Sequence, residues 1–95
     1  MTKSNISTED KLINAGLKGI DEYYEGLKSV GGTFFDITKS LEKAKEKAFL
    51  SYRMIFRKEL KELSKEEQHS SFEEQFQLIQ PTLRERATLI RDRFQ

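Results

Sequence analysis

Three stretches of the chain carry apolar residues at the spacing of an amphipathic helix, with charged residues between them. The predicted helices cover residues 8–29, 33–63 and 71–94, and short polar or glycine-containing segments separate them. Links this short join neighbouring helices in opposite directions. The pattern therefore predicts an all-α fold, an elongated antiparallel helical bundle of three main helices.

The central stretch, residues 33–63, is the longest predicted helix. It contains no Gly or Pro. Thr33 is the expected N-cap, with Asp36 in the first turn, where the helix dipole favours a negative charge. A helix of about 30 residues is roughly 45 Å long, which exceeds the roughly 32 Å diameter of a compact globule of this chain length. We therefore expect an elongated bundle, a bent helix or a second chain over the overhang. The predicted buried stripe consists of Phe34, Ile37, Leu41, Ala44, Ala48, Phe49, Tyr52, Ile55, Phe56, Leu60 and Leu63.

Two glycines, Gly16 and Gly19, fall on or beside the apolar face of the first helix. Each costs about 1 kcal/mol relative to Ala inside a helix. We interpret them as sites where a neighbouring backbone comes close; the alternative is a break that leaves two short helices. Gly31 is the expected left-handed residue that ends this helix.

The segment before the third helix is polar. Residues 64–67 match a capping box, which could start a short helical turn over residues 64–69, but 65–71 contains no apolar residue and is predicted to be a connector. Pro81 then lies inside a stripe that keeps its helical phase. This favours one helix kinked at Pro81, and the alternative is two helices with Pro81 at the start of the second. The stripe consists of Phe72, Phe76, Ile79, Leu83, Ala87, Ile90 and Phe94.

The face of the central helix opposite its apolar stripe is basic and interrupted by an apolar pair. Like charges four residues apart cost roughly 0.2–0.5 kcal/mol each, so this face is not optimised for helix stability alone. It predicts a partner-binding surface; the alternative is a solvated face with two stray apolar residues, since single exposed apolar residues are normal. The candidate residues are Lys39, Lys43, Lys47, Leu50, Met54, Arg57, Lys58 and Lys61.

Composition narrows the class of protein. Ninety-five residues fit one domain, which we place at 8–95 after a flexible arm at 1–7. A charged fraction of 35% is typical of helical, coiled-coil-like chains. The lack of cysteine excludes a disulfide framework and fits a reducing compartment. No apolar run approaches the roughly 20 residues of a membrane span, and no signal peptide is visible. We expect a cytoplasmic protein.

The sequence offers no recognisable catalytic or cofactor motif. His69 is the single histidine, and metal binding or catalysis would need partner residues that the sequence does not show. Neither a nucleophile elbow nor a glycine-rich phosphate loop is present. We therefore predict a protein that is not an enzyme and has no cofactor and no metal site.

Four arginines make the end of the third helix basic. They complement the helix dipole as solvated residues or form a phosphate-binding surface together with the basic face of the central helix. The net charge of +1 is too small for a global argument about nucleic acid. These arginines are Arg84, Arg86, Arg91 and Arg93.

The leading functional prediction is a helical protein–protein interaction module, such as a small adaptor, inhibitor or regulatory subunit, that associates with itself, with a dimer expected. An alternative is a nucleic-acid-binding protein that uses the basic face and the C-terminal arginines. A further alternative is attachment to an anionic membrane surface, which is disfavoured because the core needs the apolar stripe of the central helix.

Overall fold

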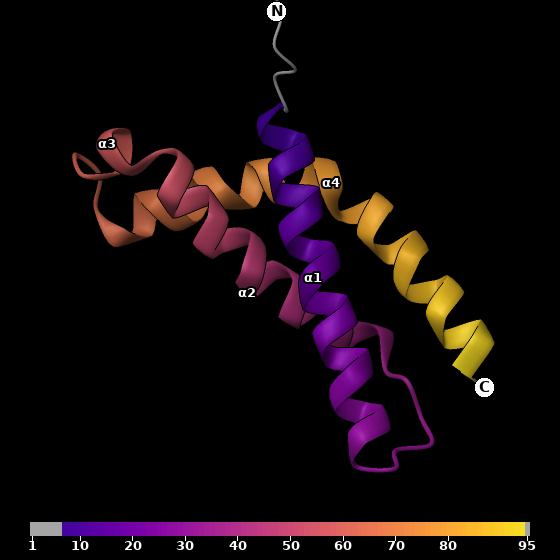
Figure 1. The fold of residues 1–95 in the computed structure, drawn as a ribbon. Coiled ribbons are helices and arrows are strands. Elements are labelled where there is room, and N and C mark those ends of the chain that lie inside the picture. The colour runs from indigo at the N-terminus through magenta and orange to yellow at the C-terminus, as the bar shows by residue number, and fades with distance from the viewer. Residues whose placement is uncertain (1–6, 95) are drawn as a thin grey trace, which may run out of the picture.

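The computed structural model describes residues 7–94, and within that range the chain forms helices and no strands (Figure 1). The all-α prediction is confirmed. Apart from Ser7, the arm expected at residues 1–7 lies outside the described residues. The helices are α1 (Thr8–Ser29), α2 (Ile37–Ile55), α3 (Arg57–Leu60) and α4 (Lys65–Phe94).

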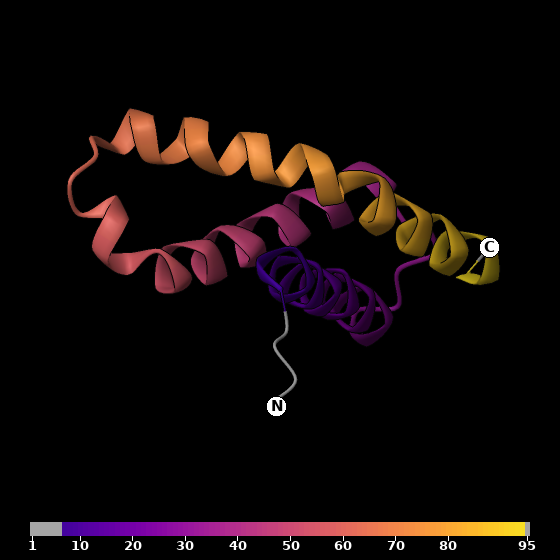
Figure 2. The ribbon, with the colours of Figure 1, turned by 90° about the horizontal axis from the view of Figure 1, so that it is seen from above.

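The helices form a flattened bundle of 44 × 37 × 21 Å. α1 and α2 run in opposite directions and pack against each other, and α4 packs against both. Seen from above, the first half of α4 follows α2 along its length (Figure 2). Its second half turns away to lie alongside α1 (Figure 1). The first half of α4 thus packs mainly along α2, and the second half lies alongside α1.

α1 is one continuous helix, so the alternative of a break near its glycines is wrong. Ser7 caps it: its hydroxyl oxygen accepts the Asp10 N–H at 3.1 Å. Gly16 faces the Leu83 side chain of α4, and Gly19 faces the α2 backbone, where an added Cβ would come within 2.7 Å of a carbonyl oxygen. The predicted close approach is therefore confirmed. Gly31 ends the helix with φ +70°, also as predicted.

The second helix begins four residues later than predicted. Asp36, not Thr33, is the N-cap: its carboxylate accepts the Lys39 N–H at 3.3 Å. The preceding residues are not helical, and in this segment Phe35 is fully buried whereas Phe34 is 60% exposed. The prediction that Phe34 belongs to the buried stripe is thus wrong. That prediction placed Phe34 inside the helix, whereas the helix begins only at Ile37.

The second helix also ends earlier than predicted, so the single helix over residues 33–63 is wrong. The backbone leaves helical geometry at Phe56, and the short α3 follows. The Gln68 side chain of α4 donates hydrogen bonds to the carbonyl oxygens of Leu60 and Leu63, at 2.8 and 3.2 Å. The Leu60 carbonyl oxygen also accepts the Leu63 N–H at 3.0 Å, so the Gln68 amide adds a second bond there and joins the end of α3 to α4. Because of this break, the second helix is shorter than the predicted helix over residues 33–63, which would have extended beyond a compact fold.

The third helix starts earlier than predicted. The capping box is confirmed: the Ser64 hydroxyl oxygen accepts the Glu67 N–H at 3.1 Å, and the Glu67 carboxylate accepts the Ser64 N–H at 2.8 Å. This cap opens α4 itself, so the connector predicted at 65–71 is wrong. Pro81 is exposed inside α4, and the helix changes direction near its middle (Figure 1). One bent helix, the favoured alternative, is confirmed.

The core lies where the three long helices meet. Its buried residues on α4 keep the predicted stripe. Phe35 reaches it from the α1–α2 loop and packs edge-on against Tyr23, with ring centroids 5.1 Å apart. Small side chains on α2 let α1 come close. The buried apolar residues are Leu12, Ile20, Phe35, Ala44, Ala48, Tyr52, Leu60, Phe72, Phe76, Ile79, Leu83, Ala87 and Ile90.

Candidate interaction surface

The outer face of α2 is divided by α1 into a covered half and an open half. α1 packs over the N-terminal half, where Gly19 lies against the backbone at Lys43 and Ala44. Lys47 forms an ion pair with Glu22 of α1 at 3.2 Å. Lys43 pairs with Glu46 of its own helix at 3.4 Å. Two of the three predicted N-terminal lysines therefore already have acidic partners.

The open half contains the predicted apolar pair. Leu50 is 50% exposed and Met54 is 79% exposed. Together with Arg53 and Arg57 they line a shallow depression of about 430 Å³. Leu50 and Met54 are four residues apart, so they lie one helical turn from each other on the same face. An exposed apolar pair beside two guanidinium groups is the main feature of this surface.

Arg53 belongs to this surface, although the sequence prediction omits it. Its guanidinium carbon lies 5.8 Å from the centroid of the Phe49 ring, which places the cation over an aromatic face. The signal was present in the sequence, since Arg53 is three residues from Leu50 and therefore a neighbour on the helix surface. We call the surface formed by Leu50, Arg53 and Met54 of α2, together with Arg57 at the start of α3, the distal α2 face.

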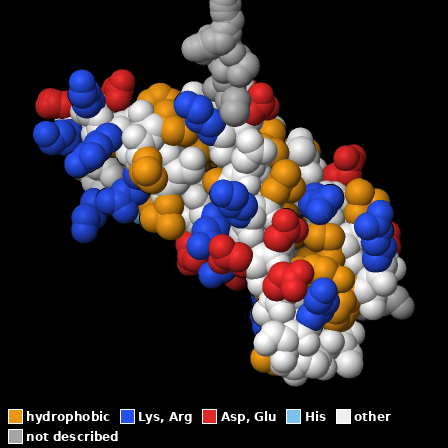
Figure 3. All heavy atoms as spheres, viewed as in Figure 1, with side chains coloured by type: hydrophobic (Ala, Val, Ile, Leu, Met, Phe, Trp, Pro, Cys, Tyr) orange, Lys and Arg blue, Asp and Glu red, His pale blue; other side chains and the backbone are white. Residues whose placement is uncertain are grey.

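The basic character continues along α3 and past its end. Arg57 and Lys58 lie on α3, Lys61 follows it, and both lysines are exposed. Arg57 and Lys61 line a second depression of about 200 Å³ with Arg53, Leu60 and Gln68. Within residues 7–94, no carboxylate lies within 4 Å of the cationic groups of Arg53, Arg57, Lys58 or Lys61. In Figure 3 basic side chains gather at this end of the molecule, next to apolar ones. Lys39 is exposed at the other end of α2.

The four C-terminal arginines do not form one patch. At 100° per residue, Arg84 and Arg91 lie on one side of α4 and Arg86 and Arg93 on the opposite side. Arg91 pairs with Asp92 at 3.2 Å. This end of α4 also lies at the opposite end of the molecule from α3 (Figure 1).

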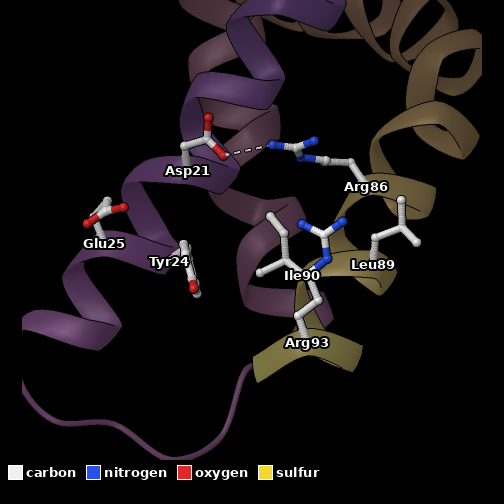
Figure 4. A pocket seen from close by; sticks show the side chains of 7 residues that line it. All are labelled: Asp21, Tyr24, Glu25, Arg86, Leu89, Ile90 and Arg93. Atoms are coloured by element: carbon white, nitrogen blue, oxygen red, sulfur yellow. Dashed lines mark ion pairs between the residues drawn. The ribbon is translucent and has the colours of Figure 1, made fainter. Parts of the chain in front are cut away.

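Arg86 and Arg93 instead line a cleft of about 330 Å³ between α1 and α4 (Figure 4). Arg86 points towards Asp21 across the cleft, and its guanidinium nitrogen lies 3.9 Å from an oxygen of the Asp21 carboxylate. Glu25 also lines the cleft, so its acids match its two arginines in number. This balance does not favour an anionic ligand. The phosphate-binding surface predicted from both basic groups is therefore split between two ends of the fold.

His69 lies in α4 rather than in a connector and stacks on Phe49, with ring centroids 4.7 Å apart and an interplanar angle of 16°. In the described part of the chain, no group of three His, Cys, Asp or Glu residues is arranged to hold a metal ion. No helix within residues 7–94 combines the length and apolar character needed to cross a membrane.

Comparison of the chain with family models, curated proteins and solved structures finds no match.

Proposed function

We propose that this chain is a helical protein–protein interaction module without enzymatic activity, a small adaptor, inhibitor or regulatory subunit, and that the distal α2 face is its contact surface. The observation that supports this most is the exposure of Met54 and Leu50, 79% and 50%, on a helix whose other apolar residues are buried or half-buried. Interfaces combine an apolar centre with a polar rim, and arginine and methionine are enriched in them. The distal α2 face has this composition.

The arrangement also supports the proposal energetically. Leu50, Arg53 and Met54 lie on α2, which packs against α1 and α4, and Arg57 follows at the start of α3. The three α2 residues therefore sit on an already folded helix and do not have to fold on binding. A preorganised surface loses less conformational entropy when a partner docks. Self-association, which the sequence predicts, stays a prediction of this proposal.

The test is a double substitution, Leu50→Glu and Met54→Glu. Both positions are exposed, so the free energy of unfolding should change by no more than about 0.5 kcal/mol per site. Sedimentation at micromolar concentration and pull-down with the purified chain should then show loss of self-association or of a captured partner. Circular dichroism should show unchanged helix content.

The matched control is Leu78→Glu with Leu89→Glu. These two leucines of α4 are 62% and 52% exposed, so the control adds the same charge at similar exposure elsewhere. Association should persist in it. Equal association in the wild type, the test variant and the control would rule out the distal α2 face, as would a wild type that binds neither itself nor any other protein.

A further inference from the structure

The distal α2 face is a shallow, open surface with exposed apolar side chains at helical spacing, and this feature suits a helical partner. This step builds on the proposed function. The depression of about 430 Å³ is lined by the apolar side chains of Leu50 and Met54 and the cationic side chains of Arg53 and Arg57. Exposed apolar residues on helical proteins can be covered by the apolar face of a bound amphipathic helix.

The charges around the depression identify the chemistry of the partner. Arg53 and Arg57 have no carboxylate within 4 Å among residues 7–94, and Lys58 and Lys61 extend the positive charge onto α3. A guanidinium group has five N–H donors in a geometry that fits a carboxylate. Acidic side chains about one helical turn from an inserted apolar residue would meet these donors.

A second copy of the chain does not supply that chemistry through the same face. A two-fold contact between two antiparallel distal faces would set Leu50 of one copy near Met54 of the other, which is favourable. The same contact would place Arg53 of each copy side by side, and like charges facing each other disfavour association. Glu46, one turn before Leu50, is paired with Lys43 of its own chain at 3.4 Å.

We infer that the distal α2 face binds an acidic amphipathic helix of another protein. A large apolar side chain of that helix packs against Leu50 and Met54 in the shallow depression. Aspartate or glutamate residues three or four positions away on the same helix pair with Arg53 and Arg57. Because this pairing is electrostatic and exposed, the affinity falls as the salt concentration rises.

The experiment is a selection from a phage-displayed library of 20-residue helices whose outward positions are randomised, with the full chain as the target. A helix of this length holds its structure better than one shorter than about 12–15 residues. Selected helices should carry an apolar residue with Asp or Glu three or four positions away. Fluorescence anisotropy with a synthetic selected helix then measures the dissociation constant.

Charge reversal makes the test specific. Arg53→Glu with Arg57→Glu should weaken binding of the selected helix by about tenfold or more, since it replaces two attractive pairs with repulsive ones. A helix with its acids changed to lysine should bind this variant better than the wild type. The matched control, Arg84→Glu with Arg91→Glu on α4, should leave affinity unchanged.

The outcomes separate this inference from the proposed function. Selected helices that are neutral or basic, selected helices whose affinity survives the Arg53 and Arg57 reversal, or the absence of any selected helix would overturn the acidic partner. If sedimentation then shows self-association that Leu50→Glu with Met54→Glu abolishes, the distal α2 face is still an interface and its partner is a second copy. If that substitution changes nothing either, the proposed function fails as well.

Discussion

Gly19 of α1 lies against the backbone of α2 at Lys43, where a Cβ atom would come within 2.7 Å of the Lys43 carbonyl oxygen. Backbone cannot move aside as a flexible side chain can, so a side chain at this position would push the two helices apart. This contact sets where α1 crosses α2, and therefore which half of the outer α2 face stays open.

The first prediction follows from this contact. Gly19→Ala should destabilise the fold by about 1–3 kcal/mol, the usual range for overpacking a tight interface. Urea unfolding monitored by circular dichroism measures the change. Gly26→Ala is the control, because nothing lies within 4 Å of an added Cβ there. It should stabilise the protein by roughly 0.5–1 kcal/mol, the usual gain from replacing a helical glycine. Equal effects at the two sites would show that the close approach is not real.

The second prediction concerns two neighbouring aromatic residues before α2. Phe35 is fully buried between Tyr23, Tyr24 and Phe94, with centroid distances of 5.1, 6.3 and 6.3 Å. Phe35→Ala should cost about 3–5 kcal/mol. Phe34→Ala should cost no more than about 0.5 kcal/mol, since that side chain is 60% exposed. Thermal unfolding of both variants measures these stability losses. A larger loss of stability for Phe34→Ala than for Phe35→Ala would mean that the second helix starts where the sequence predicts.

Much of the fold follows from the apolar spacing, as α1 and α4 show. Six of the seven residues of the predicted α4 stripe are buried, and Phe94 is half-buried, because the helical phase continues through Pro81. The helix ends are harder to predict, since they depend on single side-chain bonds. Asp36 rather than Thr33 caps α2 because its carboxylate reaches the Lys39 N–H. Both residues are good N-caps, so propensity alone could not choose between them.

The candidate surface was predictable in part. Leu50 and Met54 are exposed because they lie opposite the buried stripe, which the helical period alone indicates. The pairing of Lys47 with Glu22 could not be read from the sequence. It depends on where α1 crosses α2, and that position is set by a three-dimensional contact at Gly19. The break at Phe56 was missed because no Gly or Pro marks it.

The third prediction tests the capping box that opens α4. Ser64→Ala removes the acceptor for the Glu67 N–H and should cost about 1 kcal/mol. The first turns of α4 should fray, so amide hydrogen exchange should speed up there before the rest of the helix. Ser70→Ala, at an exposed position inside the same helix, is the control and should change stability by less than about 0.5 kcal/mol. Similar exchange in both variants would argue against the cap.

The fourth prediction concerns the ion pair between α1 and α2. Lys47 and Glu22 are 31% and 52% exposed and lie 3.2 Å apart. A double-mutant cycle with Lys47→Met and Glu22→Gln should give a coupling free energy of about 0.2–1 kcal/mol, the range for exposed pairs. The coupling should shrink in about 1 M salt, where charges are screened over about 3 Å. A coupling that is zero at low salt would show that the ion pair with Glu22 does not hold Lys47 in solution.

The last prediction concerns Gln68, the side chain that joins α3 to α4. Its amide donates to the carbonyl oxygens of Leu60 and Leu63 at 2.8 and 3.2 Å, in a part-buried site. Gln68→Ala removes both bonds and should cost about 1–3 kcal/mol, at about 0.5–1.5 kcal/mol per bond. The loss should be local, because α3 has only four residues and cannot hold itself as a helix. Amide exchange over residues 57–63 should therefore accelerate more than exchange in α1.

The control for this substitution is Gln77→Ala, at an exposed position of α4. It should leave both stability and the exchange of residues 57–63 unchanged. The Gln68 variant also tests how much α3 contributes to binding, since Arg57 and Lys58 lie on it and Lys61 follows it directly. If α3 loosens and a selected acidic helix still binds with wild-type affinity, Arg53 on α2 supplies the charge without an ordered α3. If affinity falls together with the order of α3, the basic residues on and after α3 contribute to binding through its helical form.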